Sequence, residues 1–171
     1  MTIKSGRKII FITGGTRSGK SSFGIKLAED SIKALGLRLK ENKNFLEETS
    51  ALNLKPKKAY IATAQAFDEE MKDRIERHKK ERGGDWHIVE EPLDIVRALK
   101  ELKEYPVILI DCLILWISNL MLNNLDIQKK TEGFLNTIKS SACGLKPLAL
   151  IIVSNEVGMG IVPENELARR F

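Results

Sequence analysis

Hydrophobic and polar positions alternate along the chain in segments that have the lengths of strands and helices. The run at residues 8–13 (KIIFIT) is bounded by two glycines and predicts a buried strand that enters a glycine loop. Apolar residues then recur at roughly helical spacing from Phe23 to Ile32, and Gly36 suits the end of that helix. The first unit is therefore expected to be a strand, a loop and a helix.

The same alternation continues to the end of the chain. Further strands are predicted at residues 58–63, 86–90, 107–110 and 148–153. Helices are predicted at residues 68–80, 93–102, 113–122 and 131–142, with Pro92 in the first turn of the second of these. Strands that alternate with helices predict an α/β fold, in which a mostly parallel central sheet carries helices on both faces.

Length and composition indicate one globular domain over residues 1–171. With 43% hydrophobic residues, the chain can bury a continuous core. Residues 37–56 are polar and rich in lysine, and are expected to form an extended or partly helical surface insertion. No apolar run approaches the roughly 20 residues of a membrane helix, and no secretory leader is evident, so the expected location is the cytoplasm.

Cysteine and charge content narrow the choice of ligand. Cys112 and Cys143 lie far apart without a neighbouring histidine, which predicts buried thiols rather than a zinc site or a disulfide. The net charge of +5 suits a polyphosphate ligand, a nucleic acid or an anionic membrane surface. Acidic residues are interleaved with the basic ones and aromatic residues make up only 6%, which argues against a nucleic-acid surface.

The strongest motif is a phosphate-binding loop between the first strand and the first helix. Residues 14–21 match the pattern G-x-x-x-x-G-K-[ST] of P-loop proteins, and so predict a three-layer fold like that of P-loop NTPases. The predicted nucleotide contacts are Gly14, Gly15, Thr16, Arg17, Ser18, Gly19, Lys20 and Ser21. Lys20 is expected to reach the terminal phosphates and Ser21 to hold Mg²⁺.

Other polar residues end the predicted strands. Asp111 closes a hydrophobic strand, as does the second acidic Mg²⁺ ligand of such folds, although a role as helix N-cap is an alternative. Thr63, Glu90 and Glu156 also lie at strand ends, where ligands of open α/β sheets collect. Either Asp111 or Glu156 is expected to position the metal together with Ser21.

A histidine falls on the inner face of the helix after the second strand. Met71, Arg74, Ile75 and His78 are spaced at i, i+3, i+4 and i+7, so the imidazole shares a face with apolar residues. Taken alone, this spacing favours a packed histidine over a catalytic one. Facing a nucleotide, a neutral imidazole would instead be able to attack the α-phosphorus and carry the nucleotidyl group.

Four segments together resemble the bifunctional adenosylcobinamide kinase / adenosylcobinamide-phosphate guanylyltransferase family of cobalamin biosynthesis. They are FITGGTRSGKSSF (residues 11–23), YIATAQAFDEEMKDRIERHKKERGGDW (60–86), LIDCLILWISNLM (109–121) and VSNEVGMGIVPENELARRF (153–171). The first indicates only a P-loop, whereas the second and the last are far more specific. Members of this family normally continue beyond the position of Phe171 with a further helix and strand.

The resemblance implies two reactions at or near one nucleotide site, with GTP, ATP and Mg²⁺. Adenosylcobinamide is first phosphorylated on its aminopropanol hydroxyl, and GTP then donates GMP to that phosphate. His78 is implied to be the guanylylated residue and Lys20 to serve catalysis, so the nucleophile role becomes the favoured one for His78. Further implied nucleotide contacts are Thr63, Ala64, Gln65, Lys79, Lys80, Glu81, Arg82, Glu90 and Asp111. The resemblance also implies a homotrimer.

Three other functions remain as alternatives. A nucleotide-regulated binding switch would bind GTP without covalent transfer, but the sequence lacks the N-K-x-D-type guanine motif of such switches. A small-molecule kinase without guanylyl transfer would not need His78. A basic nucleic-acid binder is the least favoured, because no helix-turn-helix or basic stripe is evident.

Overall fold

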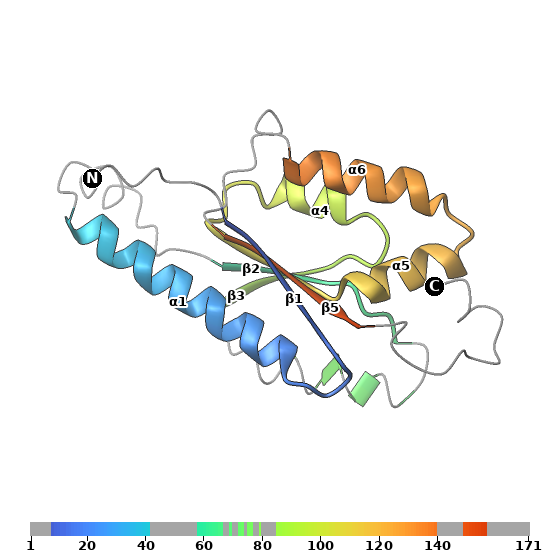
Figure 1. Ribbon diagram of the computed structural model, residues 1–171, viewed down its shortest axis with the longest axis horizontal. Helices are drawn as coiled ribbons and strands as arrows, with labels where there is room; N and C mark the ends of the chain where they lie inside the picture. The colour runs from blue at the N-terminus through green and yellow to red at the C-terminus, as the bar shows by residue number, and fades with distance from the viewer. Residues whose placement is uncertain are drawn as a thin grey trace.

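A computed structural model describes residues 8–41, 58–66, 69, 72, 73, 75, 76, 79, 85–139 and 149–156, with the side chains of the first range described as far as Gly36. These residues form a parallel sheet with helices on both faces (Figure 1). The strands are β1 (Lys8–Gly14), β2 (Lys58–Ala62), β3 (Trp86–Glu90), β4 (Val107–Asp111) and β5 (Ala149–Asn155). The helices with defined bounds are α1 (Lys20–Glu41), α4 (Ile95–Glu101), α5 (Leu113–Leu122) and α6 (Ile127–Lys139). The α/β fold class predicted from the sequence is confirmed.

Strand order and register bring the predicted site residues to one edge of the sheet. The order is β1-β5-β4-β2-β3, and all four pairings are parallel. Gly14 pairs with Asn155 across β1 and β5, and Ala62 pairs with both Asp111 and Glu90. The carboxyl ends of all five strands therefore meet where open α/β sheets bind their ligands.

Successive strand residues point into two different cores, because side chains alternate across a sheet. On one face, Tyr60, Leu109 and Ile151 pack under α1. On the other face, residues of the same strands pack against α4, α5 and α6; this core includes Ile61, Ile110, Ile152, Leu99, Trp116 and Phe134. Long buried runs such as β4 and β5 reflect this covering of both faces.

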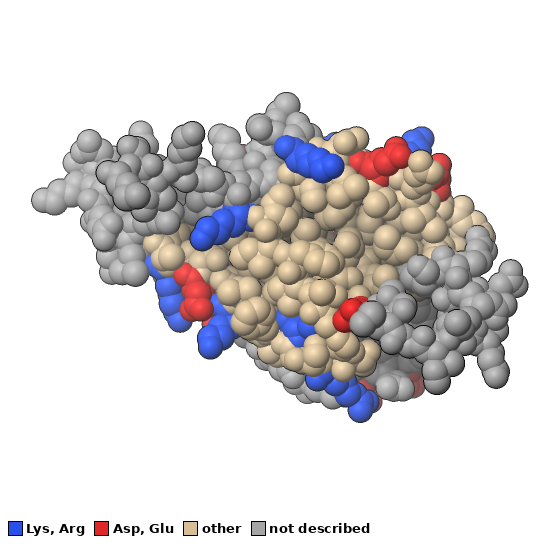
Figure 2. All heavy atoms as spheres, in the orientation of Figure 1, with Lys and Arg blue, Asp and Glu red and all other residues tan. Residues whose placement is uncertain are grey.

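Strand β1 is less covered than the central strands. Ile10 and Ile12 pack toward α1, whereas Ile9 and Phe11 on the opposite face are 47% and 58% exposed. Figure 2 shows uncharged atoms over the middle of this side of the molecule, with Lys and Arg side chains in separate groups around the border. Among the described residues, β5 is the one strand that pairs with β1.

The predicted end of the first helix and the predicted starts of two later helices were wrong. Helix α1 continues past Gly36 to Glu41, because the leucines, lysines and arginine around this glycine favour a helix enough to offset its cost of about 1 kcal/mol. Helix α4 starts at Ile95 rather than near Pro92, since the carboxylate of Asp94 caps it by accepting from the Arg97 backbone N–H at 3.2 Å. Only residues 37–41 of the predicted surface insertion are described, and they are helical.

Helix α6 begins at Ile127, four residues before the predicted start at Thr131. Asp126 accepts a hydrogen bond from the Lys129 backbone N–H at 2.9 Å, which is the contact of an N-cap residue. The predicted helix at 68–80 is described at residues 69, 72, 73, 75, 76 and 79, all of them helical. Within the described part of the chain, no helix is long and apolar enough to cross a membrane.

Candidate functional site

The glycine loop between β1 and α1 has the compact form of a phosphate-binding loop. The Ser18 backbone N–H donates to the Gly15 carbonyl at 3.3 Å, and the Phe23 N–H donates to the Gly19 carbonyl at 2.9 Å, which starts the helix. The Lys20 ammonium folds back over the loop to the Gly15 carbonyl at 2.6 Å and lies 3.4 Å from the Ser18 hydroxyl. The loop thus places a lysine and a helix N-terminus beside exposed backbone, an arrangement that attracts phosphate.

Two residues of this loop have left-handed backbone conformations. Gly19 has φ of 81°, which a residue without Cβ adopts readily, whereas Arg17 has φ of 60° despite carrying a long side chain. Non-glycine residues with positive φ are uncommon and cluster at ligand-binding loops. These backbone conformations are therefore typical of a loop that binds a ligand.

Helix α1 lies unusually close to the sheet just after the loop. A Cβ built on Gly24 would lie 3.1 Å from Leu109 Cδ1 and 3.2 Å from Val153 Cγ2. Ser21 lies three residues, about one turn, before Gly24. Asp111 lies two residues after Leu109 on the same face of β4. Ser21 and Asp111 are consequently placed at the same corner of the sheet.

Asp111 is the last residue of β4 and is held by a tyrosine. The Tyr60 hydroxyl donates to Asp111 Oδ2 at 2.6 Å. The alternative role of Asp111 as a helix cap is wrong, because the residue at the N-cap of α5 is Cys112, which makes no side-chain capping bond. The carboxylate of Asp111 thus lies at the ligand-binding edge with a donor of its own.

Thr63 supports the strand ends from inside the protein. Its fully buried hydroxyl donates to the Cys112 carbonyl at 2.7 Å and accepts from the Cys112 N–H at 2.9 Å. Its own N–H donates to the Asp111 carbonyl at 3.1 Å, beside the cis peptide between Asp111 and Cys112. The next two residues, Ala64 and Gln65, are half-buried in the loop after β2. The Thr63 side chain joins β2 to β4, and its predicted contact with a nucleotide stays a prediction.

A buried amide that sequence reasoning missed completes this linkage. Asn119 on α5 donates from Nδ2 to the Thr63 carbonyl at 2.8 Å and to the Pro92 carbonyl at 3.1 Å. One side chain therefore ties the segments after β2 and β3 to the helix that follows β4. The signal that could have indicated it is an amide within the mostly apolar run at 113–122, where a buried polar group needs a partner.

Lys79, the residue after the predicted nucleophile His78, contacts the edge of the sheet at which the strands end. Lys79 forms an ion pair with Glu90, the last residue of β3, with Nζ and Oε1 2.6 Å apart. Both residues were predicted nucleotide contacts. The remaining predictions in this segment, His78, Lys80, Glu81 and Arg82, lie outside the described residues.

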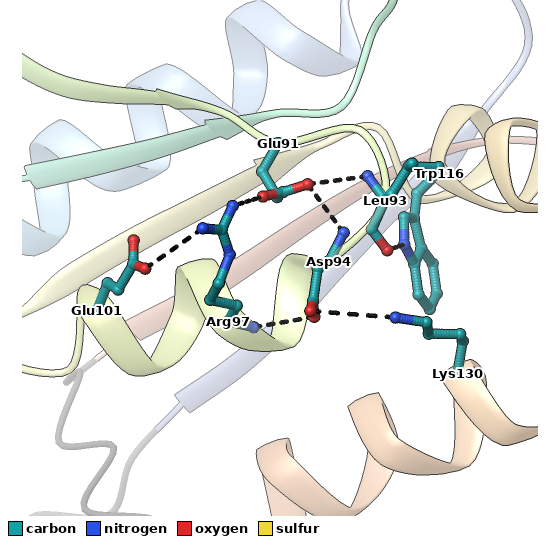
Figure 3. A network of polar contacts seen from close by, with 7 residues as sticks. All are labelled: Glu91, Leu93, Asp94, Arg97, Glu101, Trp116 and Lys130. Atoms are coloured by element: carbon teal, nitrogen blue, oxygen red, sulfur yellow. Dashed lines mark hydrogen bonds and ion pairs between the residues drawn. The ribbon is translucent and has the colours of Figure 1, made fainter.

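Next to Glu90, a second acidic residue organises the start of α4 (Figure 3). Glu91 is only 7% exposed; its Oε1 accepts from the backbone N–H groups of Leu93 and Asp94 at 3.1 and 2.9 Å, and its Oε2 pairs with Arg97. Burial raises the pKa of this carboxyl, but the hydrogen bonds from Asp94, Arg97 and Leu93 outweigh burial and lower the pKa below its ordinary value.

The buried thiol of Cys112 confirms one of the two predictions for cysteine. Cys112 is 5% exposed and forms no disulfide, and burial raises the pKa of its thiol. Cys143 lies outside the described residues. A thiol that stays protonated is a poor nucleophile, so Cys112 is a packing residue rather than a reactive one.

The donor set at this corner suits Mg²⁺ bound together with a nucleotide. Within the described ranges, no group of three or more His, Cys, Asp and Glu side chains lies close enough to hold a metal ion. Mg²⁺ in nucleotide sites normally takes only one or two protein oxygens and completes its shell with phosphates and water. The hydroxyl of Ser21 and the carboxylate of Asp111 are oxygen donors of this kind.

Comparison with known proteins agrees with the resemblance found in the sequence. The family model described as cobinamide kinase / cobinamide phosphate guanyltransferase (CobU) matches residues 42–171. The chain is 37% identical over 161 residues to the bifunctional adenosylcobalamin biosynthesis protein CobP of Pseudomonas aeruginosa. The matched region covers 94% of this chain and 78% of that protein. It is 34% identical over 176 residues to the bifunctional adenosylcobalamin biosynthesis protein CobU of Escherichia coli, and this match covers 95% of this chain and 83% of that protein. With its phosphate loop and parallel sheet, the chain belongs to the cobinamide kinase / cobinamide phosphate guanyltransferase family.

Proposed function

We propose that this chain phosphorylates adenosylcobinamide and then guanylylates the product, using the nucleotide site at the carboxyl ends of β1, β4, β2 and β3. The observation that carries the proposal is the phosphate loop, where Lys20 and the N-terminus of α1 provide positive potential beside exposed backbone. Both reactions require a nucleoside triphosphate, so one phosphate site is able to serve both.

In the kinase step, the aminopropanol hydroxyl oxygen of the substrate attacks the terminal phosphorus of the triphosphate, the nucleoside diphosphate leaves, and the hydroxyl proton is released to water. Lys20 stabilises the negative charge that develops on the transferred group, as the lysine of a phosphate loop does. GTP and ATP both carry the triphosphate that this loop would hold. When bound at Ser21 and Asp111, Mg²⁺ supplies further charge neutralisation on the phosphates.

In the transferase step, a ring nitrogen of His78 attacks the α-phosphorus of GTP. A phosphorus–nitrogen bond forms, the bond from the α-phosphorus to the bridging oxygen breaks, and pyrophosphate leaves. A phosphate oxygen of adenosylcobinamide phosphate then attacks the same phosphorus, which frees His78 and gives adenosylcobinamide-GDP. The ion pair between Lys79 and Glu90 supports this role, because it anchors the neighbour of His78 at the ligand-binding edge.

Transfer of label from GTP tests the proposal. The protein is incubated with GTP labelled at the α-phosphate and then treated with acid or alkali; a phosphoramidate survives alkali and is lost in acid. His78→Ala is expected to abolish the covalent label and the transferase reaction while the kinase reaction remains. Lys20→Ala is expected to damage both reactions. Retention of the label in His78→Ala would overturn the role of His78.

The chain offers a matched control for this experiment. His87 is the other of its two histidines and lies on β3, exposed and stacked on Tyr105 with the ring centroids 5.2 Å apart. His87→Ala is expected to label as the unaltered protein does. The homotrimeric assembly, the cytoplasmic location and the single-domain organisation stay predictions; sedimentation analysis would test the first of them.

A further inference from the structure

The buried phenol of Tyr60 lies against the proposed metal-binding edge. Tyr60 is fully buried in β2, two residues before the carboxyl end of that strand, and pairs in register with Leu109 of β4. Its ring packs at a right angle to the Trp86 indole, with centroids 5.6 Å apart and planes at 87°. Packing on this scale fixes the ring, so the direction of the hydroxyl is set by the core.

The hydroxyl of Tyr60 points toward Asp111. The Tyr60 hydroxyl donates to Oδ2 of Asp111 at 2.6 Å, reaching along the sheet to the residue that pairs with Ala62. A hydrogen bond to one carboxylate oxygen restricts rotation of the whole group. Oδ1 is then held in one orientation at the end of β4, on the face of the sheet that α1 covers.

We infer that Tyr60 is a positioning residue, which orients the Asp111 carboxylate for the Mg²⁺ that accompanies the bound nucleotide. The inference rests on the proposed function, because it requires Asp111 to bind metal. Hydrogen bonds to the ligating carboxylates of metal sites are typical, and their loss weakens metal binding by about 10- to 100-fold. A merely structural role for Tyr60 would affect folding and leave metal affinity unchanged.

Metal binding is best measured directly, with Mn²⁺ as the probe. The free Mn²⁺ signal in electron paramagnetic resonance gives the metal dissociation constant in the presence of a non-hydrolysable GTP analogue. Tyr60→Phe keeps the ring and removes the hydroxyl, and is expected to weaken Mn²⁺ binding about tenfold. In the kinase assay, the Mg²⁺ concentration for half-maximal rate should rise by a similar factor, with kcat at saturating Mg²⁺ within about twofold.

Three variants make the outcome interpretable. Tyr105→Phe makes the same chemical change before the amino end of β4 and should leave Mn²⁺ affinity unchanged. Ile61→Val removes a methyl group from the adjacent buried position on the other face of β2 and controls for general loss of stability. Asp111→Asn tests the metal role itself and should weaken Mn²⁺ binding at least as much as Tyr60→Phe.

The possible results separate the two claims. If Asp111→Asn weakens Mn²⁺ binding but Tyr60→Phe changes it less than twofold, the positioning role is overturned and the proposed function stands. An equal effect of Ile61→Val and Tyr60→Phe also overturns it, because stability alone would then explain the change. If Asp111→Asn leaves Mn²⁺ binding unchanged, the metal role of Asp111 fails and the positioning role fails with it.

Discussion

Asn119 donates a hydrogen bond from its buried carboxamide to the main-chain oxygen of Thr63, at 2.8 Å. The same nitrogen serves Pro92, so loss of the amide leaves two carbonyl groups in the interior without this donor. Asn119→Ala is therefore expected to lower the free energy of unfolding by about 2–3 kcal/mol, measured by urea denaturation. Asn123→Ala removes an exposed C-cap side chain, whose Nδ2 donates to the Asn119 carbonyl at 2.8 Å, and should lower the free energy of unfolding by only about 0.5–1 kcal/mol. Equal losses in both variants would contradict the linking role of Asn119.

The lowered pKa of Glu91 predicts a loss of stability in acid. A carboxyl with a depressed pKa in the folded state stabilises fully above its unfolded pKa, about 4.3, and loses that contribution as pH falls through the folded pKa. Glu91→Gln should therefore be less stable than the unaltered protein by about 1–2 kcal/mol at pH 7. The difference should shrink steadily below pH about 4.3.

Unfolding by urea at a series of pH values measures this difference. Glu101→Gln is the control, since Glu101 is exposed and lies 3.9 Å from the same Arg97. Its effect should be within about 0.5 kcal/mol at every pH. A difference for Glu91→Gln that does not depend on pH would show that the carboxylate charge is not what stabilises the start of α4.

Two glycines of α1 should respond to alanine with opposite signs. Gly24→Ala places a methyl group 3.1 Å from Leu109 Cδ1 and 3.2 Å from Val153 Cγ2, both of fully buried residues, and is expected to destabilise by about 1–2 kcal/mol. Gly36→Ala meets nothing within 4 Å and should stabilise by up to about 1 kcal/mol through helix propensity. Thermal denaturation of the two variants compares them directly. Stabilisation by both would mean that the contact between α1 and β4 yields without cost.

Nucleotide affinity should depend on the backbone of the phosphate loop. Gly19→Ala forces a residue with a Cβ to adopt φ of 81°, which costs about 1–2 kcal/mol and is expected to weaken binding of a fluorescent GTP analogue about tenfold. Gly133→Ala, in α6 with nothing within 4 Å, should leave that affinity unchanged. Unchanged affinity in Gly19→Ala would mean that the bound loop does not use this conformation.

Local patterns predicted the strands and the phosphate loop well, because both depend on residues close in sequence. All five predicted strands are present, and the strand at Trp86–Glu90 has its predicted bounds. Family membership also selects the enzyme over the binding switch and the nucleic-acid binder. What the pattern could not locate was capping: the carboxylates of Asp94 and Asp126 accept from backbone N–H groups three residues further on, and these bonds set where the two helices begin.

Contacts between distant residues explain the rest of what sequence reasoning missed. Tyr60 and Asp111 are 51 positions apart, and Asn119 and Thr63 are 56 positions apart. Nothing in the spacing of these residues indicates that they meet, because their distance in space is set by the order of β2 and β4 in the sheet. Polar residues within apolar segments do mark positions where a partner is needed, but they do not identify the partner.

The strand that leads into the phosphate loop also affects how the protein must be handled. Within the described residues, β1 pairs with β5 alone and exposes Ile9 and Phe11, and a sheet edge of this kind is a template on which a second molecule can add its own strand. Concentrated preparations will therefore tend to self-associate through the segment from which the nucleotide loop emerges. Nucleotide titrations are best performed on dilute samples, so that aggregation is not mistaken for lost affinity.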